Sequence, residues 1–433
     1  MSTGPGPGPT IELVVGPVAH GGHCVSRHEG RVVFVRHTLP GERVRARVTA
    51  GGPGDRFWRA DAVEVLEASP DRVAPPCPYA GPGRCGGCDW QHVEPAAQRG
   101  LKAAVVAEQM RRLAGVEVSP VVEALPGAPG GLGWRTRVTF SVDGEGRAGL
   151  RRHRSSDVLP VDRCLIAHPG VASVDVLRHR WPGVESVQVV ASSVAERAVV
   201  VRPGDPSEPD RRARLPRLDP GVSVLVDAGG DRPERVRGRI RVHEESSGRR
   251  FQVTAGGFWQ VHPAAADTLV DAVLAASLPT EGECAVDLYS GVGLFASALA
   301  ERVGPGGSVV AVEADPRAAA DARRNLHDLP QVRLLHGRVD RELAGSGLPR
   351  ADLVVLDPPR TGAGRRVVEQ VTALAPRAVV YVACDPAALA RDVSTFAGHG
   401  FALASLRAFD LFPMTHHVEC VALLTPPGRG EVS

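Results

Sequence analysis

Three reactive side chains stand at the ends of apolar segments in the last third of the sequence. Cys384 and Asp357 each follow such a segment, and Glu419 lies at the start of another. A cysteine at the carboxyl end of a parallel strand faces the rim of an α/β sheet, and the N-terminus of the next helix helps to lower the pKa of its thiol. Cys384 is therefore a candidate nucleophile. Taken singly, a buried packing cysteine and an ordinary strand-edge glutamate are the commoner interpretations of Cys384 and Glu419.

A glycine-containing turn in the segment 286–295 (VDLYSGVGLF) predicts a ligand site. An apolar strand runs into this turn and a helix follows, so Gly291 and Gly293 allow a ligand to approach the backbone at the carboxyl end of the strand. The next strand ends in Glu313, which is placed to accept hydrogen bonds from a ribose diol. Because Ala296 stands where a dinucleotide site has its third glycine, the turn suits S-adenosylmethionine as well as a dinucleotide. A tight turn without a ligand is the alternative.

The motif Asp357-Pro358-Pro359-Arg360 narrows the chemistry. A polar residue followed by two prolines at the end of the fourth strand is typical of methyltransferases that act on nucleobases. Enzymes that methylate amino groups usually have an aromatic residue after the prolines, whereas this sequence has Arg360. The motif therefore favours methyl transfer to a nucleobase.

Four cysteines outside these motifs have a spacing that fits a metal site. Cys77, Cys85 and Cys88 lie in one loop, which ends in the run CGGC, and Cys164 lies far downstream. Three thiolates and a distant fourth bind either a [4Fe–4S] cluster or a structural zinc ion, and the spacing alone leaves both open. The cysteines without a motif are predicted to be packing residues: Cys24, Cys284 and Cys420.

The elements that must position these residues change in kind along the chain. Strand-like runs separated by glycine turns over 11–70 predict a small OB-like β-barrel, and 94–115 has the periodicity of a helix. Strand-like segments with Arg- and Pro-rich loops continue to about residue 255. From residue 263 apolar strands alternate with helices, which is typical of a doubly wound α/β domain. The predicted fold class is thus multidomain α/β.

Composition excludes several classes of protein. The chain has 433 residues, 43% of them hydrophobic, which suffices for roughly three domain cores and excludes wholesale disorder. No apolar stretch approaches the ~18 residues of a membrane span, and the N-terminus lacks a signal-peptide pattern. Eight cysteines are too few for a disulfide framework. We therefore expect a cytoplasmic protein with no membrane association.

Positive charge is concentrated in two regions of a nearly neutral chain. The formal net charge is +2, yet 131–165 holds seven Arg against four acidic residues, and 211–250 holds eleven against six. A basic region on a near-neutral chain suits a polyanionic partner such as nucleic acid. Solvated surface arginines are an equally good interpretation of the charge alone.

Taken together, the motifs DLYSGVGLF, DPPR, VACDPAALARD and FPMTHHVE resemble those of the RNA uracil-C5 methyltransferases in order and spacing. The resemblance covers nearly the whole chain, because GRVVFVRHTLPGERVRARV is similar to the central stretch of a TRAM domain and CGGCDWQH to the family's iron–sulfur loop. It implies an N-terminal OB-like TRAM β-barrel, a central β-rich cluster domain and a C-terminal class I, Rossmann-like methyltransferase domain. The implied boundaries are a disordered tail over 1–10, the barrel over 11–70, the central domain over 71–92 plus 118–255, and the methyltransferase domain over 93–117 plus 256–433.

The resemblance also implies roles for the candidate residues. Cys384 would add to C6 of a uracil, Glu419 would remove the C5 proton, and Asp357 would lie between cofactor and uracil. Contacts with the cofactor S-adenosylmethionine are implied for a larger set: Gln260, Tyr289, Gly291, Gly293, Glu313 and Asp357. The family often has Asn two residues after that glutamine, where this chain has His262.

The implied metal centre is a [4Fe–4S] cluster, with zinc as the alternative. Its ligands would be Cys77, Cys85, Cys88 and Cys164. The gap between the first two is longer than in the family, and a loop absorbs the extra residues easily.

The implied partner is folded RNA, with no obligate protein partner evident. The combination of a TRAM domain with a cluster favours 23S rRNA, and tRNA is the alternative substrate. A non-catalytic RNA-binding or assembly factor is a further alternative, and the intact set of Cys384, Glu419, Asp357 and Gln260 argues against it.

Overall fold

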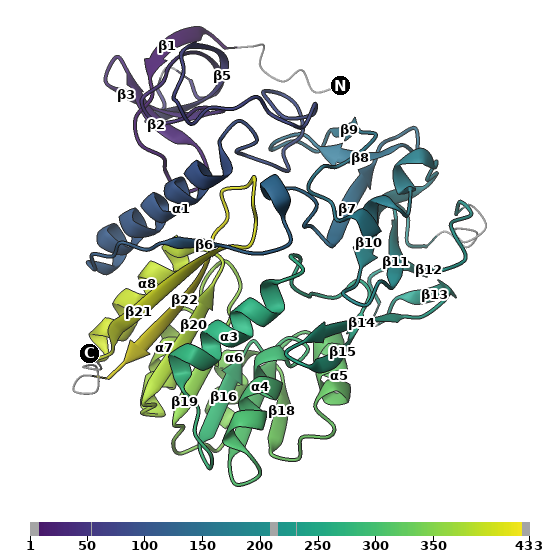
Figure 1. The fold of residues 1–433 in the computed structure, drawn as a ribbon, viewed down its shortest axis with the longest axis vertical. Helices are drawn as coiled ribbons and strands as arrows, with labels where there is room; N and C mark the ends of the chain where they lie inside the picture. The colour runs from purple at the N-terminus through teal and green to yellow at the C-terminus, as the bar shows by residue number, and fades with distance from the viewer. Residues whose placement is uncertain (1–7, 53, 208–214, 231, 427–433) are drawn as a thin grey trace.

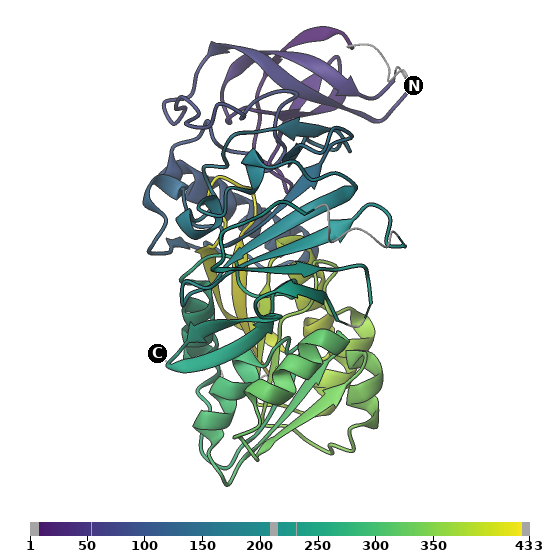
Figure 2. The ribbon, with the colours of Figure 1, turned by 90° about the vertical axis from the view of Figure 1, so that its right-hand side faces the viewer.

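Three parts follow one another along the molecule in the computed structural model, which describes residues 8–52, 54–207, 215–230 and 232–426. Figure 1 shows a small barrel at one end, an α/β domain at the other, and a β-rich central part beside them. The view turned by 90° shows the same succession (Figure 2). The expected tail over 1–10 lies mostly outside the described residues, and the first strand begins at Thr10.

The N-terminal part is a five-stranded sheet with the spatial order β1-β4-β5-β3-β2. Its strands are β1 (Thr10–Val14), β2 (Cys24–His28), β3 (Arg31–Arg36), β4 (Arg43–Ala50) and β5 (Phe57–Glu67). The two end strands, β1 and β2, also contact each other, so the sheet curls into a barrel. Alternate residues such as Ile11 and Leu13 point into its core, which is the pattern of a sheet with one buried face.

The central part is built on a seven-stranded sheet with the order β13-β12-β11-β10-β7-β8-β9. Its elements are β7 (Arg137–Val142), β8 (Ala148–Arg151), β9 (Val158–Pro160), α2 (Pro169–Ala172), β10 (Val184–Ala191), β11 (Arg197–Pro203), β12 (Val222–Val226) and β13 (Glu234–Arg237). A hairpin of β14 (Arg241–Ser246) and β15 (Arg249–Thr254) follows. Its apolar residues, Phe251 among them, belong to the core of the α/β domain.

The C-terminal part is a doubly wound α/β domain, as predicted. Its strands are β16 (Cys284–Leu288), β17 (Ser308–Glu313), β18 (Val332–His336), β19 (Leu353–Leu356), β20 (Ala378–Ala383), β21 (Ala402–Asp410) and β22 (Glu419–Thr425). Its helices are α3 (Ala265–Ser277), α4 (Leu294–Val303), α5 (Pro316–Asn325), α6 (Val339–Gly345), α7 (Arg365–Ala373) and α8 (Pro386–Gly398). The first five strands are parallel, and β22 is antiparallel to both neighbours. Strands β19 and β20 are wholly buried because helices cover both faces of the sheet.

A segment from the N-terminal half completes this sheet. The loop over 71–92, called here the cysteine loop, leads into α1 (Pro95–Gln109), a π-helical turn (Met110–Ala114) and the short strand β6 (Val122–Ala124). α1 packs on α8, and β6 pairs in parallel with β21, so the order of the sheet is β18-β17-β16-β19-β20-β22-β21-β6. In the part of the chain that the structure describes, no helix combines the length and apolarity needed to cross a membrane.

Candidate active site

Three predicted residues meet at the carboxyl edge of the α/β sheet. Asp357 follows β19, Cys384 follows β20, and Glu419 opens β22. β20 and β22 are antiparallel neighbours, and the pairing of Ala383 with Cys420 places Cys384 beside Glu419. β19 runs parallel to β20 on its other side, so Asp357 emerges at the same edge. The topology thus gathers one thiol and two carboxyl groups from three separate segments.

The charges of these three groups act on one another. Burial, then Glu419 and Asp357, raise the pKa of the Cys384 thiol to about 12, and Arg360 opposes that rise. Burial and Asp357 raise the pKa of Glu419 well above its usual range, again against Arg360. Burial also raises the pKa of Asp357. Three acidic groups in one partly buried site therefore retain protons that exposed groups would lose.

A cavity of about 170 Å³ opens at Cys384. Polar side chains from the barrel and from the α/β domain line it: His20, Arg360, Asp385, His416 and His417. Arg360 Nη2 lies 3.3 Å from His417 Nε2. Burial, His416 and Arg360 lower the pKa of His417 to about 3, so its imidazole is neutral at physiological pH. Arg360 is consequently the lasting positive charge beside the thiol.

The segment 411–418 between β21 and β22, called here the catalytic loop, is fixed by the cysteine loop. The backbone N–H groups of Asp89 and Trp90 both donate to the carbonyl of Met414, each at 3.0 Å. The Asp89 carboxylate accepts from the backbone N–H of His416 at 3.2 Å and lies 2.6 Å from its Nδ1. Because Glu419 follows the catalytic loop directly, these contacts fix the approach to Glu419.

A buried ion pair joins the same region to α1. Lys102, the only lysine of the chain, is buried, and its Nζ donates to Asp410 Oδ1 at 2.5 Å and to the Phe412 carbonyl at 3.1 Å. Asp410 ends β21, so the pair anchors the start of the catalytic loop. A buried pair of this kind is costly to break, because the remaining partner keeps an uncompensated charge.

The glycine turn after β16 has the geometry of a ligand cradle. Tyr289, Gly291 and Gly293 all have positive φ, at 64°, 55° and 94°. The backbone N–H of Gly291 donates to Glu313 Oε2 at 2.8 Å, so Glu313 borders the turn from the end of β17. A Cβ on Gly291 would meet no atom within 4 Å, whereas a Cβ on Gly293 would lie 2.9 Å from Leu326. Gly293 is thus required for helix packing, and the turn is open at Gly291.

Two buried polar side chains, Asp287 of β16 and Ser290 of the turn, make no well-formed hydrogen bond with the part of the chain that the structure describes, although the backbone N–H of Ala296 is near enough to Asp287 to lower its pKa. Both carboxyl oxygens of Asp287 and the hydroxyl of Ser290 are buried. Burial raises the pKa of Asp287 well above its usual range, and Asp357 and Glu313 add to the rise. Buried polar atoms are normally satisfied, so these groups indicate a polar ligand. S-adenosylmethionine fits, since it carries an ammonium group and ribose hydroxyls that can donate to them.

Asp357 acts on both sites at once. It raises the pKa of Asp287 in the glycine turn, and it raises the pKa values of Cys384 and Glu419 in the cavity. Asp357 therefore lies within electrostatic range of both sets, and its place between cofactor and uracil stays a prediction.

Gln260 and His262 lie in the connection between β15 and α3. Gln260 is partly buried, and His262 is buried, stacking on Trp134 with ring centroids 6.1 Å apart. Burial lowers the pKa of His262 to about 4, so it packs there as a neutral ring. His262 therefore has a structural role in joining the central part to α3.

The four cysteines predicted to bind metal lie within electrostatic range of one another. Burial raises the pKa of Cys88, and Cys164, Cys85 and Cys77 add to the rise. Burial and the neighbouring thiols likewise raise the pKa values of Cys85 and Cys164. Within the described ranges, however, no three His, Cys, Asp or Glu side chains are grouped closely enough to hold a metal ion.

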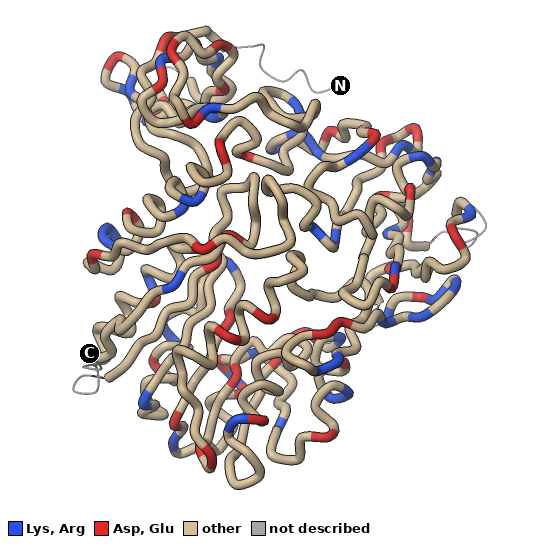
Figure 3. Tube along the Cα trace, in the orientation of Figure 1, with Lys and Arg blue, Asp and Glu red and all other residues tan. Residues whose placement is uncertain are grey.

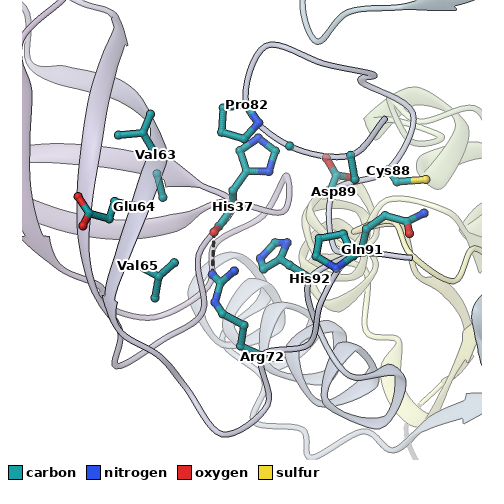
Figure 4. A pocket seen from close by; sticks show the side chains of 14 residues that line it. His37, Val63, Glu64, Val65, Arg72, Pro82, Cys88, Asp89, Gln91 and His92 are labelled. Atoms are coloured by element: carbon teal, nitrogen blue, oxygen red, sulfur yellow. Dashed lines mark hydrogen bonds between the residues drawn. The ribbon is translucent and has the colours of Figure 1, made fainter. Parts of the chain in front are cut away.

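A second cavity, of about 160 Å³, lies between the barrel and the cysteine loop (Figure 4). Arg72 reaches from the cysteine loop to the barrel, where it donates to the His37 carbonyl at 2.8 Å and to Glu42. Burial lowers the pKa values of His37 and His92 to about 3 and 4, so both rings lining this cavity are neutral. Figure 4 shows the Cys88 sulfur directed away from the cavity. Cys88 still lines this cavity, so the space borders the thiol cluster.

Comparison with known proteins agrees with the fold. Residues 347–426 match the family model "tRNA (Uracil-5-)-methyltransferase", and residues 7–60 match the TRAM domain. The chain is 53% identical to a protein of Streptomyces avermitilis described as an uncharacterized RNA methyltransferase, over 98% of this chain and 100% of that protein. A Streptomyces coelicolor protein of the same description is 52% identical over 98% and 94%.

A solved structure has the same fold over almost the whole chain. The tRNA (uracil-54, C5)-methyltransferase of Pyrococcus abyssi, in complex with S-adenosyl-L-homocysteine, superposes with a TM-score of 0.70 at 23% identity. The match covers 95% of this chain and 99% of that chain. The fold and site define an S-adenosylmethionine-dependent methyltransferase with a TRAM domain. The chain belongs to the RNA (uracil-5-)-methyltransferase family and is an enzyme that acts on RNA.

Several residues around the site were not among the sequence-predicted set. Arg360 lies in the motif that begins at Asp357, and Asp287 lies in the segment that carries the glycine turn. A charged residue inside each motif was the signal that could have identified them. His20, Asp385 and His417 also line or border the cavity. His20 could not have been found from local sequence, because its significance depends on a contact with a residue 365 positions away.

Proposed function

We propose that this enzyme methylates C5 of a uridine in 23S rRNA through a covalent bond between Cys384 and C6 of the uracil. The observation that carries the proposal is that Cys384, which lines the cavity, lies within electrostatic range of Glu419 and Asp357, and that Asp357 also acts on Asp287 before the glycine turn. Uracil C5 is a weak nucleophile. A thiolate that adds to C6 converts the ring into an enolate, whose C5 can accept a methyl group.

In the first step the Cys384 thiolate attacks C6, and the electron pair of the C5–C6 bond moves onto the O4 carbonyl. Two neighbouring carboxylates would oppose the thiolate, so a proton held on the Asp357–Glu419 pair favours this step. Arg360 is the positive charge that stabilises the thiolate. The raised carboxyl pKa values are thus part of how the nucleophile forms.

S-adenosylmethionine, when bound at the glycine turn, supplies the methyl group that C5 takes. Asp287, Ser290 and Glu313 hold it there, and Gly291 leaves the space for it. Asp357, which acts on both sites, separates the two ligands and orients the uracil edge.

In the last step Glu419 takes the proton from C5, and the electrons of that C–H bond re-form the C5–C6 double bond as the Cys384–C6 bond breaks. Once the thiolate charge has passed into the ring, the carboxyl pair can release its proton and act as a base. A buried glutamate with a raised pKa is a stronger base than an exposed one. Cys384 leaves as a thiolate, and the site is restored.

The barrel and the central part offer a surface for the RNA backbone and unpaired bases. The Arg31 guanidinium lies 4.4 Å from the centre of the Trp58 ring, and Arg59 lies 5.4 Å from the ring of Phe57, which is 43% exposed. Arg154 of the central part is near enough to lower the pKa of Arg59, in addition to burial. Arginine interleaved with exposed aromatic rings suits single-stranded RNA, from which the target base is flipped out.

Not all of the basic regions serve this surface. Basic residues along β13 are visible at the edge of the central sheet in Figure 3. Two arginines of the basic regions are structural: Arg137 of β7 pairs with Glu244 of the hairpin at 2.8 Å, and Arg237 of β13 donates to the carbonyls of Asp219 and Val222. The charge concentration in 211–250 is therefore partly a means of holding the hairpin and loops together.

The four cysteines Cys77, Cys85, Cys88 and Cys164 are proposed to bind a [4Fe–4S] cluster. The mutual effect of the four thiols on pKa supports a shared site, and the preference for a cluster over zinc rests on the family resemblance. The cluster would fix the cysteine loop, and through Asp89 and Trp90 the catalytic loop. No step of the transfer needs an electron.

Mass spectrometry of rRNA and tRNA from cells lacking the gene tests this function. We expect one 5-methyluridine of 23S rRNA to disappear and the modification to return with the wild-type gene. The match to a tRNA-modifying enzyme makes tRNA the second candidate. Loss of 5-methyluridine only in tRNA would keep the chemistry and overturn the rRNA substrate.

A further inference from the structure

A turn of the barrel reaches into the cavity of the α/β domain. Residues 19–22 connect β1 to β2, and the backbone N–H of Gly22 donates to the carbonyl of Ala19 at 3.2 Å, closing a tight turn. Gly21 and Gly22 have φ values of 97° and 80°, a conformation that favours glycine. The turn therefore presents His20 at its tip with a defined geometry.

Three contacts fix this turn against the rest of the enzyme. The Trp90 indole donates to the carbonyl of Gly22 at 3.0 Å. A Cβ on Gly22 would lie 2.7 Å from the Cβ of His416, so the turn packs directly on the catalytic loop. His20 Nε2 lies 3.0 Å from Asp385 Oδ2, with the His20 side chain 37% exposed and that of Asp385 21% exposed. The barrel thus meets the active site through a residue of its own.

Asp385 is the neighbour of Cys384 and begins the helix that follows it. Its Oδ1 accepts from the backbone N–H of Ala388 at 2.8 Å, which caps α8. Its Oδ2 is the oxygen that contacts His20, so the two oxygens are held from two sides. The charge of Asp385 also opposes formation of the Cys384 thiolate. A hydrogen bond to Asp385 therefore fixes the backbone beside the nucleophile and offsets a charge that disfavours it.

We infer that His20 of the TRAM barrel is a positioning residue for Cys384, acting through Asp385, so that the nucleophile is competent only while the barrel is docked on the α/β domain. This role rests on the proposed function of Cys384. It assigns the barrel a part in the chemical step, in addition to any contact with RNA. The groups that face Cys384 from the surrounding elements are Glu419, Asp357, Arg360, His417 and Asp385 itself, and His20 is the contribution of the barrel.

The test is a double-mutant cycle on the full-length enzyme, with His20→Ala, Asp385→Asn and the double variant. The first readout is the rate at which iodoacetamide alkylates Cys384 without RNA or cofactor, followed by mass spectrometry of the peptide. Removing His20 also opens the cavity to the reagent, but it does so in both backgrounds, so the cycle cancels that effect. We expect the factor by which His20→Ala slows alkylation to be roughly threefold larger in the wild-type background than in the Asp385→Asn background.

The second readout separates chemistry from RNA binding. With saturating RNA, His20→Ala should lower kcat by roughly tenfold while the dissociation constant for RNA stays within about twofold, and His20→Gln, which keeps a donor near the same position, should restore most of kcat. The matched control is His327→Ala. His327 is an exposed histidine that also lies beside an aspartate, with its Nδ1 3.8 Å from Asp328 Oδ1. This control should leave both readouts unchanged.

Two results would overturn the inference. One is strict additivity in the alkylation cycle, which would mean that His20 does not act through Asp385. The other is a loss confined to RNA affinity, which would make His20 an RNA contact only. If the proposed function itself fails, Cys384→Ala stays active, whereas the alkylation cycle still reports on the pair of His20 and Asp385.

Discussion

The Cys384 cavity and the cysteine loop both contain partly buried thiols, and burial raises the thiol pKa in both. Their neighbours differ. Cys384 faces two carboxyl groups and one arginine, whereas Cys88 and Cys164 face other thiols and Arg135. A thiol surrounded by thiols becomes a thiolate when a metal binds it. A thiol beside carboxylates that can take up a proton becomes a thiolate when its own proton moves to them. Under the proposed function, the same residue type therefore serves structure in one place and catalysis in the other.

Of the substitutions that test this comparison, Cys384→Ala should have the largest effect on activity. We expect tritium release from 5-tritiated uridine in RNA to fall by at least about 10³-fold, because no other group at the site can add to C6. S-adenosylmethionine binding, measured by calorimetry, should be retained, since the glycine turn is untouched. Cys284→Ala is the control, a partly buried cysteine at the start of β16 in the same sheet. Activity in Cys384→Ala would refute the covalent mechanism.

Glu419→Ala should lower turnover by about 10²- to 10³-fold and leave a product that Cys384→Ala cannot form. Without the base, the methylated uracil stays attached to Cys384, so a protein–RNA adduct should accumulate on a denaturing gel. Glu123→Ala, which removes an exposed carboxylate paired with Arg407 at 2.8 Å, should behave as wild type. Lost turnover without an adduct would remove Glu419 from the step assigned to it.

Asp357→Asn tests the carboxyl side of the comparison through the pH dependence of stability. The pKa of Asp357 is raised to about 7, so the folded state favours its protonated form, and wild-type stability decreases as pH rises from about 4 through 7. Asp357→Asn has no carboxyl group to ionise at this position, so it does not lose stability in this way. In urea unfolding of the cofactor-free enzyme it should be more stable than wild type by about 2–4 kcal/mol at pH 8 and equal to it at pH 4. A difference independent of pH would contradict the assignment.

Cys88→Ser should have the smallest effect on catalysis. We expect loss of bound iron and sulfide, and a roughly tenfold lower rate of methyl transfer, because Asp89 and Trp90 no longer hold Met414 and the catalytic loop firmly. Affinity for S-adenosylmethionine should be unchanged. Cys284→Ser is the control for removing a thiol. Zinc in place of iron in the wild-type protein would keep the structural role and overturn the cluster assignment.

The sequence was sufficient for the parts of the fold whose signals are local. Continuous apolar strands such as β20, the glycine turn at Gly291, and the alternation in β1 each predict their own structure. The gathering of Cys384 with Asp357 and Glu419 was predictable only through the resemblance of the whole motif set. Spacing within each motif does not reveal strand order.

The remainder depended on contacts between distant segments. Lys102 has no motif, and its burial against Asp410 follows only from the packing of α1 on the α/β domain. The helix over 94–115 was predicted, yet the pairing of β6 with β21 was not, since a three-residue strand carries almost no periodic signal. The raised pKa of Asp287 likewise needs three carboxyl groups placed in space.

The position of α1 and β6 has a consequence for biosynthesis. Both leave the ribosome before the central part, but their partners, α8 and β21, follow at residues 386–410. At about 5–20 residues per second, roughly 280 residues must be added after β6 before it can pair, which takes on the order of 15 to 55 seconds. During that time α1 can pack on the barrel through Val105, but the face that includes Val106 lacks its partners from the α/β domain. That face therefore stays uncovered until translation is almost complete.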